Sequence, residues 1–242
     1  MRLNRFLAAA GLGSRRSCEA LILEGAVSLD GQIVTKLATQ VLPDSVVEVN
    51  GSRVQAKQAT YLAFYKPRGV LTTRSDTEGR STIYDLLPTE FGNLFYVGRL
   101  DKDSEGLLIL TNDGDLSQKI THPSHLTEKE YEVWLDRAFI PEDGKKLVAG
   151  FHIPGGRARV ASVYKTGSRR VKVTLQQGIK RQIRLMFYKL GYEVERLRRD
   201  RIGGIFLNKM KPGEYRKLSA QEIRRLQKND KAPAPREKRR RS

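Results

Sequence analysis

The N-terminal residues carry apolar side chains at the spacing of two short helices. Leu3, Leu7 and Ala10 recur at steps of three or four, which predicts a helix over 2–10 that ends at two nearby glycines. Ser14 follows and is a good N-cap, because its hydroxyl can accept from a free backbone N–H at the start of a second helix. Apolar positions continue at this spacing up to a further glycine, so we expect two helices joined by a tight turn.

Two short hairpins are predicted after the helices. The stretch AVSLDGQIV places Asp30-Gly31 between two apolar runs, and VVEVNGSRV does the same with Asn50-Gly51. Asp-Gly and Asn-Gly favour the two-residue turn whose backbone needs positive φ at both positions. We expect residues 1–58 to form a small domain of a helix pair and hairpins.

Residues 59–228 show a different pattern, in which strands and helices are mixed. Alternating or continuous apolar runs predict strands at YLAFYKP, LFYVGRL, LLILTN, EYEVWL and RVKVTLQ, and helical spacing predicts helices at KRQIRLMFYKLG and AQEIRRLQ. The pattern indicates an α+β domain with a mainly antiparallel sheet. Residues 229–242 are rich in Pro, Ala, Lys and Arg without apolar periodicity, so we expect a disordered basic tail.

The net charge of the chain indicates which class of molecule it binds. The chain has 45 Lys plus Arg against 27 Asp plus Glu, a net charge of +18. Such an excess favours a polyanion, and nucleic acid gains affinity by releasing counterions from each neutralised phosphate. An anionic membrane surface is the alternative, but no apolar run approaches the ~20 residues that cross a bilayer, and no helix pairs a basic with a bulky aromatic face.

Cysteine content and the N-terminus bear on the compartment. Cys18 is the single cysteine, which excludes an internal disulfide, a cysteine-rich zinc site and a CxxC pair. The basic start is too short and too interrupted by Arg for a signal peptide. We expect a cytoplasmic protein.

Basic residues gather in the predicted N-terminal domain. An ordinary solvated face is the alternative, but these charges are nearly all positive and lie on two helices tied by one turn, which favours RNA binding. The candidate contacts are Arg2, Arg5, Arg15, Arg16 and Lys36.

The stretch GRLDKDSEGLLILTNDGDLS, residues 98–117, carries the main candidate for chemistry. Asp101 follows a predicted strand and would lie in a loop that can approach a substrate. A carboxylate in a basic, RNA-binding surface can act as nucleophile or general base, although a structural ion pair is the commoner role of an Asp beside an Arg. For Asp103 and Asp113 we expect turn or N-cap roles.

These stretches together resemble a known family. Residues 1–50 are similar to the ribosomal-protein-S4-like domain, and GRLD followed by GLLILTNDG resembles the central motif of the ribosomal RNA pseudouridine synthases of RsuA/RluB type. Four further stretches match in the family's order: KPRGVLTT (66–73), EKEYEV (128–133), QGIKRQIRLMFYKLG (177–191) and RIGGIFLNKMKPGEYRKLS (201–219). One departure is Arg184-Leu185, where the family often has two arginines.

The resemblance implies roles for individual residues. Asp101 would be the catalytic carboxylate, with Arg184 paired to it and holding it ionised. Tyr131 would stack on the target uracil, Arg99 would hold the displaced strand after base flipping, and Leu207 would pack beneath the base. Without the resemblance, the strand pattern around Tyr131 favours a core residue.

Two more basic residues belong to the matched motifs. Arg181 shares a helical face with Arg184 and would contact RNA or lie in solvent, and Lys66 opens the first motif, where we also expect an RNA contact. The implied reaction uses no hydride, phosphate or metal, so we expect no cofactor. The three histidines form no HxxxH or HxH ligand pattern: His122, His125 and His152.

Two other functions remain as alternatives. A noncatalytic RNA-binding or ribosome-assembly factor would explain the charge but not an intact GRLD with Tyr131 and Arg184. An RNA nuclease or glycosidase would need clustered metal-binding carboxylates or a second well-placed acid. We expect a monomer that acts on ribosomal RNA or pre-ribosomal particles, with a preference for the large subunit.

Overall fold

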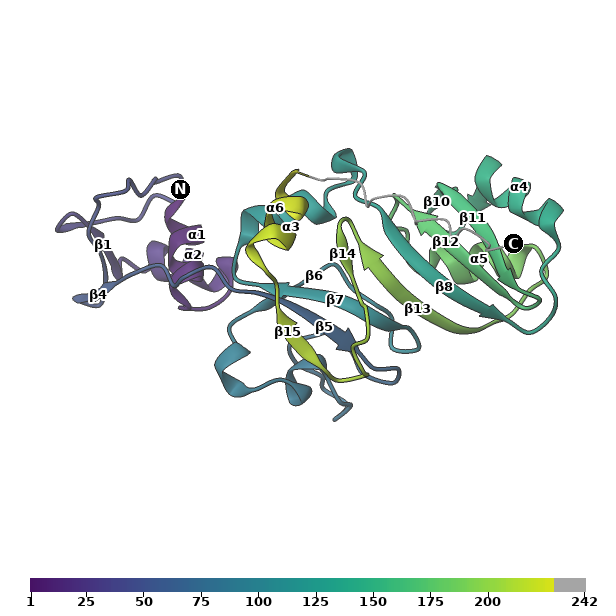
Figure 1. Cartoon of the computed structure of the whole chain (residues 1–242). Coiled ribbons are helices and arrows are strands. Elements are labelled where there is room, and N and C mark those ends of the chain that lie inside the picture. Colours follow the sequence, from purple (N-terminus) through teal and green to yellow (C-terminus); the bar gives the residue numbers. More distant parts are fainter. Residues whose placement is uncertain (229–242) are drawn as a thin grey trace.

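The computed structural model describes residues 1–228, and the basic tail predicted at 229–242 lies outside these residues. The N-terminal domain, at one end of Figure 1, contains two helices followed by a four-stranded sheet of order β2-β1-β3-β4. Its elements are α1 (Leu3–Ala10), α2 (Arg15–Leu23), β1 (Val27–Leu29), β2 (Gln32–Ile33), β3 (Val47–Val49) and β4 (Ser52–Val54).

Local sequence explains this domain well. The Ser14 hydroxyl accepts from the Ser17 backbone N–H at 3.1 Å and caps α2, as predicted. Asp30 and Gly31 both have positive φ, 52° and 81°, which is the turn geometry that the Asp-Gly pair favours. The Asn50 turn has the same geometry, with φ of 49°. Both hairpins are therefore confirmed.

The C-terminal domain is built on one long sheet of nine strands (Figure 1). Its elements are β5 (Tyr61–Lys66), η1 (Ile83–Leu86), η2 (Thr89–Phe91), β6 (Phe95–Val97), β7 (Glu105–Thr111), α3 (Gly114–Thr121), η3 (Pro123–His125), β8 (Lys129–Leu135), α4 (Pro141–Ala149), β9 (Phe151–Ile153), β10 (Gly156–Ala158), β11 (Ser162–Gly167), β12 (Arg170–Leu175), α5 (Gln182–Lys189), β13 (Val194–Ile202), β14 (Ile205–Phe206), β15 (Tyr215–Lys217) and α6 (Ala220–Lys228).

The sheet order is β11-β12-β8-β13-β7-β5-β15, with β14 beside β13 and β6 beside β7. Among the residues that the structure describes, the strand pairings are antiparallel except that between β7 and β13. The predicted α+β class with a mainly antiparallel sheet is confirmed. The sequence analysis did not predict β13, α3 or α4, because their charged residues obscure the apolar spacing.

The junction between β7 and β13 depends on one glycine. A Cβ added to Gly106 would lie 2.3 Å from the Arg199 carbonyl oxygen and 2.7 Å from the Arg199 nitrogen. Gly106 also has a φ of +107°, which other residues rarely adopt. No other residue fits here without moving the backbone, so Gly106 permits the two halves of the sheet to join.

Separate apolar clusters cover the sheet. Beneath α5, residues from β8, β12 and β13 pack with Met186 and Phe187. A second cluster joins β5, β7, α3 and α6, and a third lies under η1 and η2. Among residues 1–228, we find no helix with the length and apolar content that crossing a bilayer requires.

The two domains touch through side chains. Arg5 of α1 forms an ion pair of 2.5 Å with Asp115 of α3, and donates to Gln118 at 3.4 Å. The connecting segment is held at the end of β7, where the Asn112 side chain accepts from the Thr60 backbone N–H at 2.8 Å. The division at residues 58 and 59 stays a prediction.

Candidate active site

Asp101 lies in the loop between β6 and β7, as predicted. Its backbone carbonyl accepts from the Ser104 N–H at 3.0 Å, which closes a tight turn. The residue is half-buried, and its carboxylate makes no hydrogen bond or ion pair with any residue that the structure describes. Asp101 therefore presents an uncommitted carboxylate at the surface of a structured loop.

Asp103, two residues later, is the paired carboxylate of the loop. Arg181 donates to both of its oxygens at 3.2 and 3.3 Å, and Arg184 Nε lies 3.4 Å from Oδ2. Burial raises the pKa of Asp103, but the hydrogen bond from Arg181 and the charge of Arg184 outweigh burial, and the pKa is lowered overall.

The predicted ion pair between Arg184 and Asp101 is wrong. Arg184 donates to the Asp103 carbonyl at 3.0 Å and to the Val194 carbonyl at 2.6 Å. These two backbone acceptors fix the guanidinium under residue 103, and its ion pair forms there. Burial lowers the pKa of Arg184, while the charges of Asp103 and Asp101 act in the opposite direction. Arg184 thus supports the loop and lies near Asp101 without bonding to it.

The structure also contradicts the predicted RNA contact of Lys66. Its side chain is 0% exposed and donates to the carbonyls of Pro67 at 2.9 Å and Ser104 at 2.7 Å. A third acceptor, the Lys102 carbonyl, lies at 3.5 Å. Burial lowers the pKa of Lys66 to about 8. The ammonium group therefore supports the Asp101 loop from below and does not reach a phosphate at the surface.

Tyr131 occupies the middle of β8 and is 8% exposed. It shares the apolar cluster beneath α5 with Leu100, the residue before Asp101. Its hydroxyl has no hydrogen bond to the described residues. Leu207 is 5% exposed but belongs to the second cluster, with Ile202 and Ile205. The structure thus brings Tyr131 close to the Asp101 loop and places Leu207 in a separate apolar cluster.

The remaining predicted contacts fall into two groups. The Arg99 side chain is exposed beside Asp101. Four basic residues of the N-terminal domain are exposed as an RNA-binding role requires, and they are Arg2, Arg15, Arg16 and Lys36. Arg5 differs, because its guanidinium forms an ion pair with Asp115 of the other domain.

Arg199, a buried arginine of β13, was not predicted from the sequence. It is 2% exposed, and it donates from Nε to the Leu107 carbonyl at 2.7 Å and from Nη1 to the Arg99 carbonyl at 3.4 Å. The stretch RLRRDRI could have indicated a buried arginine, because side chains alternate along a strand and this puts Arg198 and Arg199 on opposite faces.

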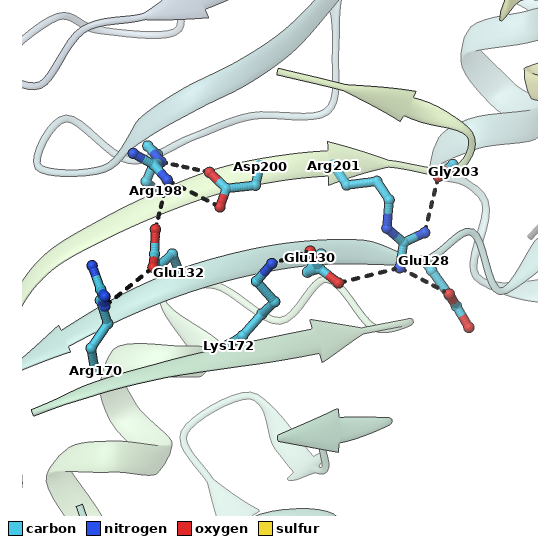
Figure 2. A network of polar contacts seen from close by, with 9 residues as sticks. All are labelled: Glu128, Glu130, Glu132, Arg170, Lys172, Arg198, Asp200, Arg201 and Gly203. Carbon is cyan, nitrogen blue, oxygen red and sulfur yellow. Dashed lines mark hydrogen bonds and ion pairs between the residues drawn. The ribbon is translucent and has the colours of Figure 1, made fainter. Parts of the chain in front are cut away.

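The opposite face of the same strands carries a network of ion pairs (Figure 2). Glutamates of β8 lie between basic residues of β12 and β13: Glu130 is 3.2 Å from Lys172, and Glu132 is 2.6 Å from Arg198. Arg201 is paired with Glu128 at 3.1 Å. On this face the charges compensate one another.

A groove of about 880 Å³ opens at the start of β8. Lys129 and Arg159 supply positive charge, and Leu126, Val148 and Ile179 supply apolar surface. Burial lowers the pKa of Lys129 to about 8. Lys129 precedes Tyr131 by two residues on one strand, so both side chains lie on one face of the sheet. Glu128 also lines the groove and Tyr131 does not, so the groove has a small excess of positive charge and lies next to the strand of Tyr131.

No group of three or more His, Cys, Asp or Glu residues within 1–228 is arranged to hold a metal ion. Asp113, which lies near the loop in sequence, has the predicted N-cap role, since its carboxylate accepts from the backbone of Asp115 and Leu116 at 3.0 Å.

Comparison with known proteins identifies the family. Residues 60–189 match the family model described as RNA pseudouridylate synthase, and residues 1–47 match the S4 domain. An RNA pseudouridine synthase of Mycobacterium leprae is 43% identical, over 94% of this chain and 93% of its own length. The ribosomal large subunit pseudouridine synthase B of Bacillus subtilis is 34% identical, over 93% of this chain and 95% of its own length.

A solved structure agrees with these relatives in fold and length. The crystal structure of a pseudouridylate synthase superposes with a TM-score of 0.69 and 29% identity, covering 93% of this chain and 99% of that chain. The range of the family model, residues 60–189, includes the loop of Asp101 and the strand of Tyr131. The chain belongs to the RNA pseudouridine synthase family.

Proposed function

We propose that this enzyme converts uridine to pseudouridine in ribosomal RNA, with Asp101 as the catalytic carboxylate. The observation that carries the assignment is the contrast within one loop. Asp103 is committed to Arg181 and Arg184, whereas Asp101 has no partner among the described residues. An unpaired, half-buried carboxylate in a cation-rich site is available to a substrate, and a paired one is not.

The reaction is an isomerisation, so the product has the same atoms as the substrate, and the proposed mechanism uses one carboxylate. The N1–C1′ bond of uridine breaks, and the electron pair leaves with the uracil ring. Asp101 either bonds to C1′ as a nucleophile or removes the C2′ proton as a base. The ring then turns, C5 bonds to C1′, the C5 proton is lost and N1 gains a proton. As C5 bonds to C1′, the bond between Asp101 and C1′ breaks on the nucleophilic route, and on the base route the proton held by Asp101 returns to C2′.

The target must leave its stack before this can happen. Unstacking costs a few kcal/mol, and stacking on an aromatic side chain offsets part of that cost. We assign this role to Tyr131, which lies on the strand beside the groove of Lys129 and Arg159. We assign to Arg99, which is exposed next to Asp101, the binding of the strand from which the base has left.

Ribosomal RNA of the large subunit is the substrate that we favour. The net charge of +18 and the S4 domain support an RNA polyanion, and a relative of 34% identity is named for the large subunit. We further propose that the enzyme acts as a monomer in the cytoplasm and modifies free or pre-ribosomal RNA.

The assignment is tested with unmodified ribosomal RNA and assembly intermediates from the protein's own source. Pseudouridine is mapped by carbodiimide-stop sequencing after incubation with the wild type or Asp101→Asn. We expect one new stop in large-subunit RNA that Asp101→Asn does not produce. Tight RNA binding without a stop on any precursor would instead support a ribosome-assembly factor.

A further inference from the structure

Arg199 occupies the floor of the site between the two residues on which the proposed reaction depends. In the sheet register it lies opposite Tyr131 of β8 and opposite Gly106 of β7. Directly paired residues of adjacent strands point to the same face of a sheet, so the Arg199 side chain rises beside Tyr131. Gly106 has no side chain, which leaves the space toward the Asp101 loop open to Arg199.

The guanidinium of Arg199 bonds to the backbone on both sides of Asp101. It donates to the carbonyl of Arg99, two residues before Asp101, and to that of Leu107, six residues after it. Nη2 is buried and has no hydrogen-bond partner among the described residues. No carboxylate of residues 1–228 forms an ion pair with Arg199. The side chain therefore keeps an unused donor and an uncompensated charge.

Two further cations lie close to Arg199. Lys66 of β5 and Arg199 of β13 are both paired with Gly106 of β7, and Lys129 lies two residues before Tyr131, the partner of Arg199 in β8. Burial is the main cause that lowers the pKa of both lysines, and the charge of Arg199 acts in the same direction. The charges of Asp101, Asp103 and Glu105 raise the pKa of Lys66, but none of these carboxylates forms an ion pair with it. Grouping three cations away from water costs free energy unless a negative charge joins them. Asp101 and its neighbours contribute negative charge from a distance, but no carboxylate of residues 1–228 forms an ion pair with Lys66, Lys129 or Arg199.

We propose that Arg199, flanked by Lys66 and Lys129, stabilises the negative charge that develops on the uracil ring when the N-glycosidic bond breaks. The proposal rests on the proposed function, in which uracil lies between Asp101 and Tyr131. Neutral uracil gains little from a cation, whereas the departing ring carries the electron pair of the N1–C1′ bond on N1 and its carbonyl oxygens. The free Nη2 donates to one of those oxygens.

Such a site acts on the rate more than on binding. Because charge appears on the ring only as the bond breaks, the interaction is stronger in the transition state than in the bound substrate. Preorganised donors in a site shielded from water are effective for this purpose, and removal of one typically costs about 100-fold in rate. The phosphates that hold the RNA on the surface do not reach this depth.

The test compares Arg199→Met with Arg201→Met in the full-length protein. Arg201 lies on the same strand and is also buried, but it faces Glu128 and Glu130 on the other side of the sheet. Each variant is assayed in single turnover with target RNA that contains either uridine or 5-fluorouridine. Loss of the N-glycoside is followed by nucleoside analysis, and RNA affinity is measured separately. The fluorine stabilises the departing ring anion without help from the protein.

For Arg199→Met we expect a rate loss of about 100-fold with uridine and less than about tenfold with 5-fluorouridine, with RNA affinity within about threefold of wild type. Arg201→Met should change both rates by the same factor. Equal losses of Arg199→Met on the two substrates would overturn the proposal.

Folding and the identity of the catalytic carboxylate are controlled separately. If Arg199→Met does not fold, Arg199→Gln, which keeps hydrogen-bond donors but removes the charge, carries the same comparison of substrates. Failure of both to fold while Arg201→Met folds would make Arg199 a stability residue and end the proposal. Asp101→Asn is assayed in parallel, and if it stays active, the proposed function fails whatever the Arg199 variants do.

Discussion

The two faces of β13 carry the same residue type in opposite electrostatic situations. On one face, Arg198 is paired with Glu132 of β8 and Arg201 with Glu128 just before β8, and both belong to the network in Figure 2. On the other face, Arg199 is buried beside Tyr131 and has no carboxylate partner among residues 1–228. The Asp101 loop repeats this contrast, because Asp103 is paired and Asp101 is not.

We interpret the difference as one between charges that stabilise the fold and charges that our proposal assigns to the substrate. A paired charge is already compensated within the protein and interacts only weakly with a ligand. An unpaired buried charge destabilises the folded chain, and such groups concentrate where a reaction uses them. In this enzyme the unpaired groups of both signs, Asp101 and Arg199, lie around one site.

The largest effect is expected from Gly106→Ala, which would separate β13 from β7. The two faces of β13 could then no longer be compared in a folded sheet. The new Cβ would lie 2.3 Å from the Arg199 carbonyl oxygen. We expect a loss of stability on the order of 3 kcal/mol, with loss of folded protein. Urea unfolding measures it. Gly156→Ala is the control, since Gly156 also has a positive φ of +123° but nothing within 4 Å of the added atom.

Arg184→Met would sharpen the comparison within the Asp101 loop. Arg184 holds the loop through the Asp103 carbonyl, whereas the more exposed Arg181 bonds only to the Asp103 carboxylate. We expect Arg184→Met to lower the single-turnover rate by about 100-fold. Arg181→Met should lower it by less than about tenfold, because exposed ion pairs contribute little. Equal losses would show that the carboxylate pair, and not the backbone contact, positions the loop.

The pH dependence offers a third test, because rate and stability should change in opposite directions. The pKa of Lys66 is lowered from 10.5 to about 8, so in this interval the unfolded chain holds a proton that the folded chain has lost. The contribution of Lys66 to stability therefore rises between these pH values. The site loses a positive charge over the same interval, and the rate should fall above about pH 8.

Lys66→Met separates the two trends. Its stability relative to wild type should decrease as pH rises from about 8. Its rate should fall less steeply than that of wild type in that range, because only Lys129, whose pKa is also lowered to about 8, still loses its charge there. Chemical unfolding and single-turnover assays at matched pH values measure both. A wild-type rate that stays level up to pH 10.5 would argue against a role for the ammonium charge.

The smallest effect is expected on the paired face. Lys172 is 3.2 Å from Glu130, with a side chain 37% exposed. Lys172→Met should change stability by less than about 1 kcal/mol and leave the rate unchanged, because solvent screens such pairs. Thermal unfolding and the standard assay suffice. A marked rate loss here would mean that the network in Figure 2 also serves the reaction.

Sequence predicted the parts of the molecule that local chemistry determines. The turns at Asp30 and Asn50 follow from a preference for positive φ, and the Ser14 cap follows from a single hydroxyl. The position of Asp101 followed from a strand that ends and a second that begins soon after it. The motif order then identified the family, which the comparisons confirm.

Long-range contacts account for what sequence did not predict. β13 is mostly charged, and the residues that neutralise it come from β8, more than 60 positions earlier, as in the pair of Arg198 and Glu132 with a separation of 66. The partner of Arg184 depends on where α5 meets the loop. The burial of Lys66 depends on the loop that folds over it. None of these contacts leaves a local pattern in the sequence.

The most direct test compares Asp101→Asn with Asp103→Asn in one single-turnover assay and one melting experiment. We expect Asp101→Asn to melt like the wild type, because it breaks no ion pair, and to lower the rate by at least about 10⁴-fold. Asp103→Asn should melt a few degrees lower, because it loses Arg181 and Arg184, and keep a measurable rate. An active Asp101→Asn, or an Asp103→Asn as inactive as Asp101→Asn, would contradict the division between paired and unpaired charges.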